Sequence, residues 1–253
     1  MKLRADVLLV ERELATSRTQ AQALILSGRV FSGERRIDKS GESLLSDAEL
    51  TVRGGPRFVS RGGDKLDAAL TELPIDVRGA VVVDIGASTG GFTDCVLQHG
   101  AVAVYAVDVG HGQLAHQLRQ DARVVVLERT NARHLTGASF PQRIDLVVVD
   151  ASFIGIDKLM PAIAAILPPT GHLLALVKPQ FEAGRDAARR ARGVIRDPEV
   201  RSSAISAAKA AIAGAGFEIL GECDSRVPGP KGNVERFVLA RRCDAQSTST
   251  QTS

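Results

Sequence analysis

The sequence predicts an α/β protein with a doubly wound, mostly parallel sheet, preceded by a small α+β domain. From about residue 64 onward, apolar strand-like runs alternate with amphipathic helix-like segments. Five of these runs are continuously apolar, as expected for strands that helices cover on both faces. The first run leads into the glycine-rich segment DIGASTGGF (84–92), and a glycine-rich turn after a strand is typical of a nucleotide site.

The first 52 residues are predicted to form a small domain of two helices and short strands. The spacing of apolar residues predicts helices over 5–15 and 17–28, with Ser17 as the N-cap and Gly28 as the C-terminal stop. The segment RVFSGERRIDKSG (29–41) predicts two short strands joined by a turn, and AELTV (48–52) a third. The Gly- and Arg-rich segment RGGPRFVSRGG (53–63) is then predicted to be a linker.

Residues 64–243 are predicted to form the doubly wound domain. The predicted strands are 80–85, 103–109, 123–128, 144–150, 172–178, 217–222 and 234–242. The predicted helices are 90–99, 112–120, 155–166 and 198–214. The last strand is expected to run antiparallel to the others, and the polar tail 244–253 is expected to be disordered.

Composition narrows the class of protein. The net charge of +3 and the pI of about 8.9 permit a nucleic-acid partner without requiring one. The three cysteines lie far apart without metal-ligand spacing, which favours a reduced, cytoplasmic protein with no metal site. We find neither a signal peptide nor a run long enough to cross a membrane.

The glycine-rich turn predicts the kind of ligand. Its spacing, G-x-x-x-G-G, differs from the dinucleotide pattern G-x-G-x-x-G, and no G-K-[ST] follows it. Asp108 ends the second strand, where a carboxylate can accept hydrogen bonds from ribose hydroxyls. A nucleoside without a required phosphate fits best, and S-adenosylmethionine is the common one. The alternative is a turn whose glycines serve only close packing.

Charged residues are predicted at the same edge of the sheet. Asp150 ends the fourth strand, Lys178 ends the fifth, and Glu235 begins the antiparallel last strand. A lone aspartate there is more often a helix cap and a lone lysine more often reaches solvent, but parallel strands place these side chains over one crevice. Lys65 reaches the same crevice only if the preceding helix packs beside it.

Several motifs together resemble one known family. The segments SRGGDKL, DIGASTGGFTD, DVGHGQLAHQLR, VVVLERTNAR, DLVVVDASFI, VKPQFEAGR and GNVERF are similar to those of the TlyA family, whose catalytic domain is of the FtsJ type. The segment RADVLLVERELATSRTQAQALILSGRV resembles the αL RNA-binding domain of a ribosomal small-subunit protein. The resemblance extends from about residue 3 to 241.

The resemblance implies methylation of a ribose 2′-hydroxyl in ribosomal RNA, at a cytidine, with S-adenosylmethionine as the methyl donor. The chain is short at both ends compared with the longer members, which act on both ribosomal subunits, so the large subunit is favoured. The family's catalytic tetrad falls on Lys65, Asp150, Lys178 and Glu235. The expected cofactor contacts are Asp84, Gly86, Ser88, Gly90, Gly91, Phe92, Asp108 and Asn131.

The chemistry explains why such a tetrad is needed. A ribose hydroxyl is a poor nucleophile, and it must lose its proton as it attacks the sulfonium methyl group in line. A lysine accepts that proton only if its pKa falls from about 10.4; burial lowers a lysine pKa and nearby carboxylates raise it. We expect Lys178 to take the proton, Asp150 to orient it, and Lys65 and Glu235 to position the ribose. No metal is expected.

Basic residues predict where RNA binds. Arg4, Arg18 and Arg29, with Ser17 at the start of the second helix, are expected to contact phosphates in the first domain. A solvated helix face is the alternative interpretation, because acidic residues lie between the arginines. The arginine-rich segment 184–196 is expected to form either a flap beside the crevice or the start of an amphipathic helix.

Three functions are compatible with these observations. The first is an rRNA 2′-O-methyltransferase that acts in the cytoplasm on ribosomal subunits. The second is an RNA-binding assembly factor with a vestigial cofactor fold, which the intact charged residues disfavour. The third is a membrane-lytic protein, since members of the family have been called haemolysins; the absence of a predicted membrane segment disfavours it.

Overall fold

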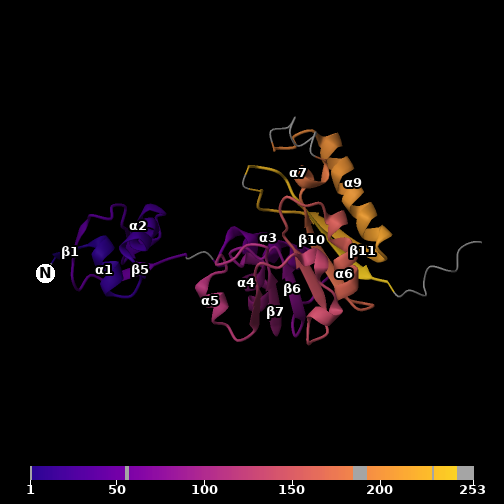
Figure 1. The fold of residues 1–253 in the computed structure, drawn as a ribbon. Coiled ribbons are helices and arrows are strands. Elements are labelled where there is room, and N and C mark those ends of the chain that lie inside the picture. The colour runs from indigo at the N-terminus through magenta and orange to yellow at the C-terminus, as the bar shows by residue number, and fades with distance from the viewer. Residues whose placement is uncertain (1, 55–56, 185–192, 230, 244–253) are drawn as a thin grey trace, which may run out of the picture. The chain divides into compact units, whose positions relative to one another are not determined.

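The structure is a computed structural model that describes residues 2–54, 57–184, 193–229 and 231–243. The chain forms two compact units, Met1–Arg57 and Phe58–Ser253 (Figure 1). The predicted tail and most of the predicted basic flap lie outside the described residues. Each unit is described by itself.

The first unit contains the two predicted helices and two small antiparallel sheets. Its elements are β1 (Lys2–Arg4), α1 (Ala5–Glu11), α2 (Arg18–Leu26), β2 (Val30–Ser32), β3 (Arg35–Arg36), β4 (Ser43–Leu45) and β5 (Leu50–Val52). The strands pair in the orders β1-β4 and β3-β2-β5, and the first of these sheets was not predicted. Helix α1 is shorter than the predicted 5–15, because the chain leaves the helix at Arg12 and Glu13 adopts a φ of 57°.

The predicted limits of the second helix are nearly correct. The Ser17 side chain accepts a hydrogen bond from the backbone N–H of Gln20, so it caps α2 as expected. Gly28 has a φ of 70°, a conformation that favours glycine, and it ends the helix two residues after Leu26. Apolar side chains from both helices, including Leu8, Leu9 and Ile25, form the buried core of this unit.

The second unit contains a seven-stranded sheet and the helices that cover it. Its strands are β6 (Val81–Ile85), β7 (Ala103–Val107), β8 (Val124–Leu127), β9 (Leu146–Val149), β10 (His172–Val177), β11 (Phe217–Asp224) and β12 (Arg236–Arg242). Its helices are α3 (Arg61–Glu72), α4 (Gly91–Gln98), α5 (His116–Arg119), α6 (Met160–Ile166), α7 (Pro179–Glu182) and α9 (Pro198–Gly214), with short 3₁₀ turns at Ala132–His134, Gly137–Ser139 and Ile156–Lys158.

The order of the strands confirms the doubly wound fold. The sheet reads β11-β12-β10-β9-β6-β7-β8, and β12 is antiparallel to both of its neighbours, as predicted for the last strand. The chain runs outward from β6 to β7 and β8, and then returns to β9 on the other side of β6. This reversal of direction places the switch point between β6 and β9, where ligands bind in sheets of this type.

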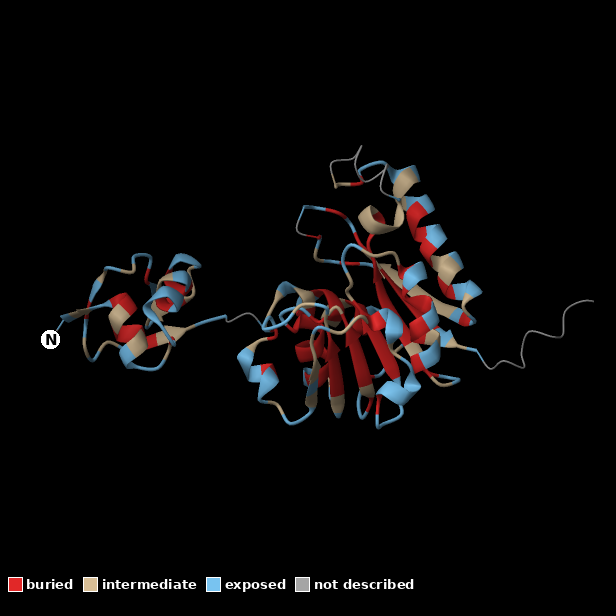
Figure 2. Cartoon of the chain, in the orientation of Figure 1, coloured by how far each residue is buried: buried red, intermediate tan, exposed pale blue. Residues whose placement is uncertain are grey.

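Helices cover both faces of the sheet, and successive strand residues point to opposite faces. Val82 packs in a core that includes residues of α3 and α4, whereas its neighbour Val83 packs in a core that includes residues of α6 and α9. Figure 2 shows that the central strands are buried along most of their length. All seven predicted strands are present, with ends within two residues of the predicted ones.

Two predicted helices are shorter than expected. The predicted helix 112–120 is reduced to α5, His116–Arg119. The predicted helix 155–166 is divided into the 3₁₀ turn Ile156–Lys158 and α6, whose first turn contains Pro161. Proline favours the first turn of a helix because it has no N–H to donate, so it marks a new start here.

Helix α3 replaces the end of the predicted linker. The boundary between the units lies at Arg57, and α3 begins at Arg61, inside the segment expected to be a linker. A Cβ on Gly63 would lie 2.3 Å from the Phe58 side chain, and one on Gly91 would lie 2.8 Å from the Gly63 nitrogen. These glycines allow the start of α3 to pack closely against Phe58 and the start of α4, so they are packing residues and not a flexible connection.

Candidate active site

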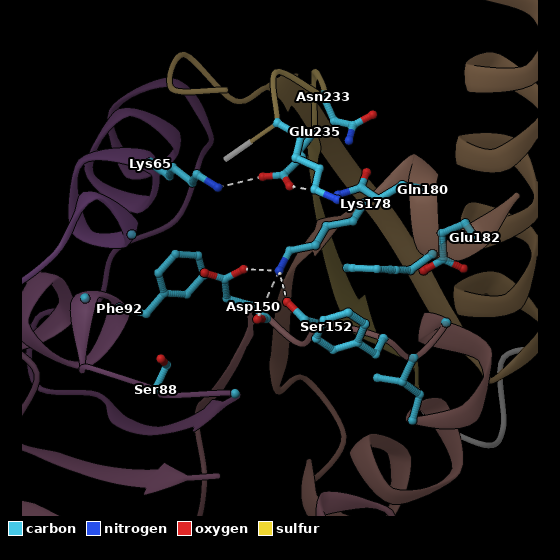
Figure 3. Close-up of a pocket in the computed structure, with 18 of the residues that line it drawn as sticks. Lys65, Ser88, Phe92, Asp150, Ser152, Lys178, Gln180, Glu182, Asn233 and Glu235 are labelled. Carbon is cyan, nitrogen blue, oxygen red and sulfur yellow. Dashed lines mark hydrogen bonds and ion pairs between the residues drawn. The ribbon is translucent and has the colours of Figure 1, made fainter. Parts of the chain in front are cut away.

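A cleft of about 1550 Å³ opens at the carboxyl ends of the central strands. It is lined by the start of α3, the glycine-rich turn after β6, and the segments that follow β9 and β10 (Figure 3). All four predicted catalytic residues, Lys65, Asp150, Lys178 and Glu235, line this cleft.

Two buried lysines of the cleft each pair with a carboxylate, and the first of these pairs is Lys178 with Asp150. Asp150 follows β9 directly and Lys178 follows β10, so the parallel pairing of these strands brings the two residues together. Lys178 Nζ lies 2.6 Å from Asp150 Oδ1, donates to the Asp150 backbone oxygen at 3.2 Å, and donates to Ser152 Oγ at 3.0 Å (Figure 3). The lysine side chain is only 9% exposed, so these three oxygens fix its position.

Lys65 and Glu235 form the second ion pair. Lys65 Nζ donates to Glu235 Oε2 at 2.6 Å, and the two side chains are 9% and 1% exposed. Glu235 also accepts a hydrogen bond from Gln180 Nε2 at 3.3 Å. We expected a preceding helix to bring Lys65 to the crevice, but Lys65 lies on α3 itself, and this helix places its side chain there. The pair joins the first helix of the unit to the start of its last strand.

The glycine-rich turn forms the floor of the cleft beside Asp150. Gly86 has a φ of 86°, and a Cβ there would lie 3.0 Å from the Asp150 backbone oxygen. Gly90 has a φ of 97°, and its Cβ would lie 2.3 Å from Leu118. Ser88, between them, has a φ of 49° and is exposed to the cleft. The glycines thus serve close packing, as the alternative interpretation held, and also let the backbone line the cleft.

Asp84 and Phe92 lie beneath this turn. Asp84 is fully buried, and its Oδ2 accepts hydrogen bonds from the Thr93 N–H at 3.0 Å and from the Thr93 hydroxyl at 2.7 Å. Its Oδ1 is buried without a partner among the described residues. Burial is the main reason that the pKa of Asp84 rises to about 7, and the nearby Asp150 and Asp108 raise it further. Phe92 lines the cleft but is 2% exposed and stacks on Phe237.

The raised pKa of Asp84 predicts a pH dependence of stability. The folded protein holds a proton up to about pH 7, whereas the unfolded chain releases it near pH 4. The free energy of unfolding should therefore fall as the pH rises through this window and level off above it. In Asp84→Asn this fall should be smaller by about 1.4 kcal/mol per pH unit.

The measurement is urea unfolding of the full chain at several pH values. The chain has one tyrosine and no tryptophan, so the fluorescence of Tyr105, on β7, reports the second unit. Asp64→Asn removes an exposed carboxyl from α3 and is the control. An unchanged slope in Asp84→Asn would show that Asp84 does not hold this proton.

Asp108 and Asn131 lie at the ends of the neighbouring strands, outside the residues that line the cleft. Asp108 follows β7, and its carboxylate accepts hydrogen bonds from the backbone N–H groups of Ser88 at 2.8 Å and Gly110 at 2.7 Å. Asn131 caps a 3₁₀ turn through a bond from the Arg133 N–H. Asp108 therefore holds the glycine-rich turn against the loop that follows β7.

The structure also adds residues that the sequence did not indicate. Phe153 is 91% exposed at the cleft, has a φ of 66°, and its ring centroid lies 5.2 Å from that of Phe181. Glu182 accepts from the Ile156 N–H, and burial raises its pKa to about 7. Their positions in the sequence could have indicated them, because Phe153 follows Asp150 closely and Glu182 follows Lys178 closely.

In the first unit, two of the predicted RNA-binding residues share one carboxylate. Arg4 and Arg18 both donate to Asp6. Ser17 uses its hydroxyl oxygen to cap α2. Arg29 is half-buried, and its Nε is buried without a partner among the described residues, so it does not join the Asp6 cluster through any described hydrogen bond.

One group of side chains in the described residues could offer three ligands to an ion. The donor atoms of Asp67 on α3, Cys95 on α4 and His99, directly after α4, lie within 4.8 Å of one another. His99 Nε2 lies 2.7 Å from Asp67 Oδ1, and Cys95 is a fully buried member of the core. This spacing was not visible in the sequence, because it depends on the packing of α3 on α4. None of the three lines the cleft.

Comparison with known protein families shows the class of protein to which this chain belongs. Residues 58–242 match the FtsJ-like methyltransferase family, and residues 3–50 match the S4 domain. The chain is thus a methyltransferase unit preceded by an S4 domain. It belongs to the FtsJ-like methyltransferase family, in the branch that contains the TlyA proteins.

Three similar proteins support this placement. The 16S/23S rRNA (cytidine-2′-O)-methyltransferase TlyA of Mycobacterium tuberculosis is 43% identical over 95% of this chain and 90% of its own. YqxC of Bacillus subtilis, a candidate rRNA methyltransferase, is 48% identical over 94% of this chain and 85% of its own. A solved structure of a candidate hemolysin from Streptococcus thermophilus is 39% identical, covers 96% of this chain and 89% of its own, and has a TM-score of 0.73.

The hemolysin name raises the question of membrane segments. Among the described residues, every helix is too short or too polar to cross a membrane.

Proposed function

We propose that this protein transfers a methyl group from S-adenosylmethionine to a ribose 2′-hydroxyl of ribosomal RNA. The observation that carries the proposal is the pair of lysine–carboxylate contacts, Lys178–Asp150 and Lys65–Glu235, in one cleft beside the glycine-rich turn. Two buried lysines held by two carboxylates give a site that can position a hydroxyl, and a lysine there can accept the hydroxyl proton when its amine is neutral. The family to which the chain belongs supports the same reaction class.

The residues around the turn fit the proposed cofactor. The buried Oδ1 of Asp84 has no partner among the described residues, and an ammonium or a water molecule that it binds would supply one. The turn lets a ligand approach the backbone at Gly86 and Ser88, while Asp108 can bind ribose hydroxyls. Gly90, Gly91, Phe92 and Asn131 remain proposed cofactor contacts.

The proposed chemistry is a single in-line displacement. S-Adenosylmethionine supplies a methyl group activated by its sulfonium. As the ribose oxygen forms a bond to the methyl carbon, the carbon–sulfur bond breaks and its electrons stay on sulfur, so the products are a methyl ether, S-adenosylhomocysteine and a proton. We assign the proton to Lys178, which Asp150 orients and which accepts the proton as a neutral amine, and we assign the positioning of the ribose to Lys65 and Glu235. This displacement has no oxyanion for a metal to stabilise, so we propose that it proceeds without one.

The first unit supports an RNA substrate. It matches the S4 domain, and its proposed RNA contacts are Arg4, Ser17, Arg18 and Arg29. We propose that the substrate is a cytidine of ribosomal RNA within a ribosomal subunit in the cytoplasm, with the large subunit preferred. Phe153 offers an exposed ring on which a base can stack; it lies beside Phe181, whose ring centroid is 5.9 Å from Lys178 Nζ.

The test is methyl transfer from labelled S-adenosylmethionine to separated small and large ribosomal subunits, followed by mapping of the methylated nucleotide. The M. tuberculosis relative is named for both rRNAs, so both subunits are assayed. Transfer to a 2′-hydroxyl supports the proposal. Binding of subunits without transfer would favour an assembly factor, and release of dye from liposomes without transfer would favour a lytic protein.

Replacing Asp108 tests the cofactor site. Asp108→Asn keeps an oxygen that can accept from the Ser88 N–H but removes the charge. We expect the affinity for S-adenosylmethionine to fall by roughly 1.5–3 kcal/mol, because a charge-assisted bond to the ribose is lost. Calorimetry measures this, and Asp145→Asn, at the opposite end of the sheet before β9, is the control. Equal affinities would remove Asp108 from the cofactor site.

A further inference from the structure

We propose that Asp6 is a positioning residue for RNA binding, and that it organises Arg4 and Arg18 into one preformed phosphate-binding fork. The inference rests on the proposed function, because it concerns how the S4 domain holds its RNA. It concerns a residue that carries the wrong charge to bind a phosphate.

The geometry of the cluster places one acid beneath two cations. Asp6, in the first turn of α1, has a side chain that is 0% exposed, whereas the side chains of Arg4 and Arg18 are 50% and 59% exposed. Arg4 donates from Nε to Asp6 Oδ1 at 2.9 Å and from Nη2 to Oδ2 at 3.0 Å. Arg18, the first residue of α2, donates from Nη2 to the same Oδ2 at 3.1 Å.

These contacts fix where the two guanidinium groups lie. Both Nη2 atoms are within hydrogen-bond distance of one oxygen, so the two like charges are held side by side although they repel each other. Gln22, one turn along α2, also donates to Oδ2 at 3.0 Å and helps to hold the carboxylate. Hydrogen bonds from Arg4, with those from Gln22 and Arg18, keep the pKa of Asp6 far below its usual range despite its burial. The carboxylate is therefore charged whenever RNA is bound.

The outward side of the cluster suits a phosphate. A guanidinium has five N–H donors, and the contacts to Asp6 use two from Arg4 and one from Arg18. The remaining donors belong to exposed groups with a net charge of +1 for the three residues together. Arginine is suited to planar, multidentate binding of phosphate, and a head that is already fixed loses less entropy when it binds.

If Asp6 positions the arginines, the removal of its negative charge should weaken RNA binding and not strengthen it. Asp6→Asn removes a negative charge from a surface that binds a polyanion, so charge alone predicts tighter RNA binding. If Asp6 positions the arginines, affinity for ribosomal subunits should instead fall about tenfold, which corresponds to the loss of one charge-assisted hydrogen bond. The slope of log affinity against log salt should decrease by about 0.7–0.9. Glu11→Gln removes an exposed acid from the same helix and is the matched control; its affinity should be unchanged or higher.

A double-mutant cycle distinguishes a positioning role of Asp6, which acts through the two arginines, from a general structural role. In a chain that already carries Arg4→Ala and Arg18→Ala, Asp6→Asn should have no further effect on subunit binding, because it acts only through these arginines. Circular dichroism and the affinity for S-adenosylmethionine are measured on each variant to show that both units remain folded. An equal loss in both backgrounds, or tighter binding by Asp6→Asn alone, would overturn the inference. Wild-type protein that fails to bind subunits would contradict the proposed function itself, whereas wild-type binding with an unaffected Asp6→Asn would contradict only the role of Asp6.

Discussion

Lys178→Ala is expected to reduce the single-turnover rate of methyl transfer by about 10²–10⁴-fold, the range that a positioned proton acceptor contributes. Lys178 Nζ lies in the cleft within 2.6 Å of Asp150, and it is the lysine that we assign to the ribose proton. The affinity for S-adenosylmethionine should change by no more than a few-fold, because the proposed cofactor contacts lie mainly on the glycine-rich turn and the loops after β7 and β8.

The experiment needs variants that separate charge from proton transfer. Lys178→Arg keeps a cation beside Asp150 but cannot accept a proton at neutral pH, so it should be as inactive as the alanine variant. Lys209→Ala removes a lysine of α9 that pairs with Glu222 of β11; neither residue lines the cleft, so this variant should keep wild-type activity. Near-normal turnover by Lys178→Ala would remove Lys178 from the reaction. If Lys178→Arg kept its activity while Lys178→Ala lost it, the role of Lys178 would be electrostatic and would not include proton transfer.

Deletion of residues 1–57 is expected to abolish tight binding of ribosomal subunits and to leave a folded, cofactor-binding second unit. The division falls after Arg57, and Phe58 already belongs to the core of the second unit. Each phosphate contact that is lost should lower the slope of log affinity against log salt by about 0.9 on a duplex or about 0.7 on a single strand. Loss of both arginines of the Asp6 cluster should therefore reduce the slope by about two contacts.

Three measurements decide this prediction. Calorimetry with S-adenosylmethionine shows whether the truncated protein is folded and competent, and salt titration of subunit binding gives the slope. Arg18→Ala in the full chain should lower the slope by about one contact. If the truncated protein binds subunits with undiminished affinity and slope, the S4 domain is not the RNA anchor, and the basic segment 184–196 becomes the leading candidate.

The fold was predictable because its signals are local. Apolar runs, continuous in the first five strands, identified the strands of the large sheet, and the position of Asp150 and Lys178 after two of those strands was enough to place both at one edge. Ser17 and Gly28 marked the limits of α2 because capping depends on a few adjacent residues. The role of Lys65 came from the family resemblance, and the residues alone left it open.

What could not be predicted depends on packing between distant segments. The glycines at 62 and 63 contributed to the prediction of a linker over 53–63, whereas they lie in α3 and allow Phe58 and the start of α4 to approach closely. From the sequence, Asp6 is only one of the acidic residues that lie among the arginines of the first domain, because its burial beneath two arginines follows from how α1 packs on α2. The shared environment of Asp67, Cys95 and His99 has the same origin.

The ion pair between Lys65 and Glu235 has a consequence for the biosynthesis of the protein. The two residues are 170 positions apart, and β12, which begins just after Glu235, inserts between β10 and β11 in the sheet. During translation, the strands from β6 to β10 can pair as they emerge, but the cleft lacks one of its carboxylates until the final strand has been made and inserted. A nascent chain that lacks β12 therefore has an incomplete form of the proposed tetrad. If Glu235 has the role that we propose, nonsense mutations anywhere before β12 should yield protein without methyltransferase activity.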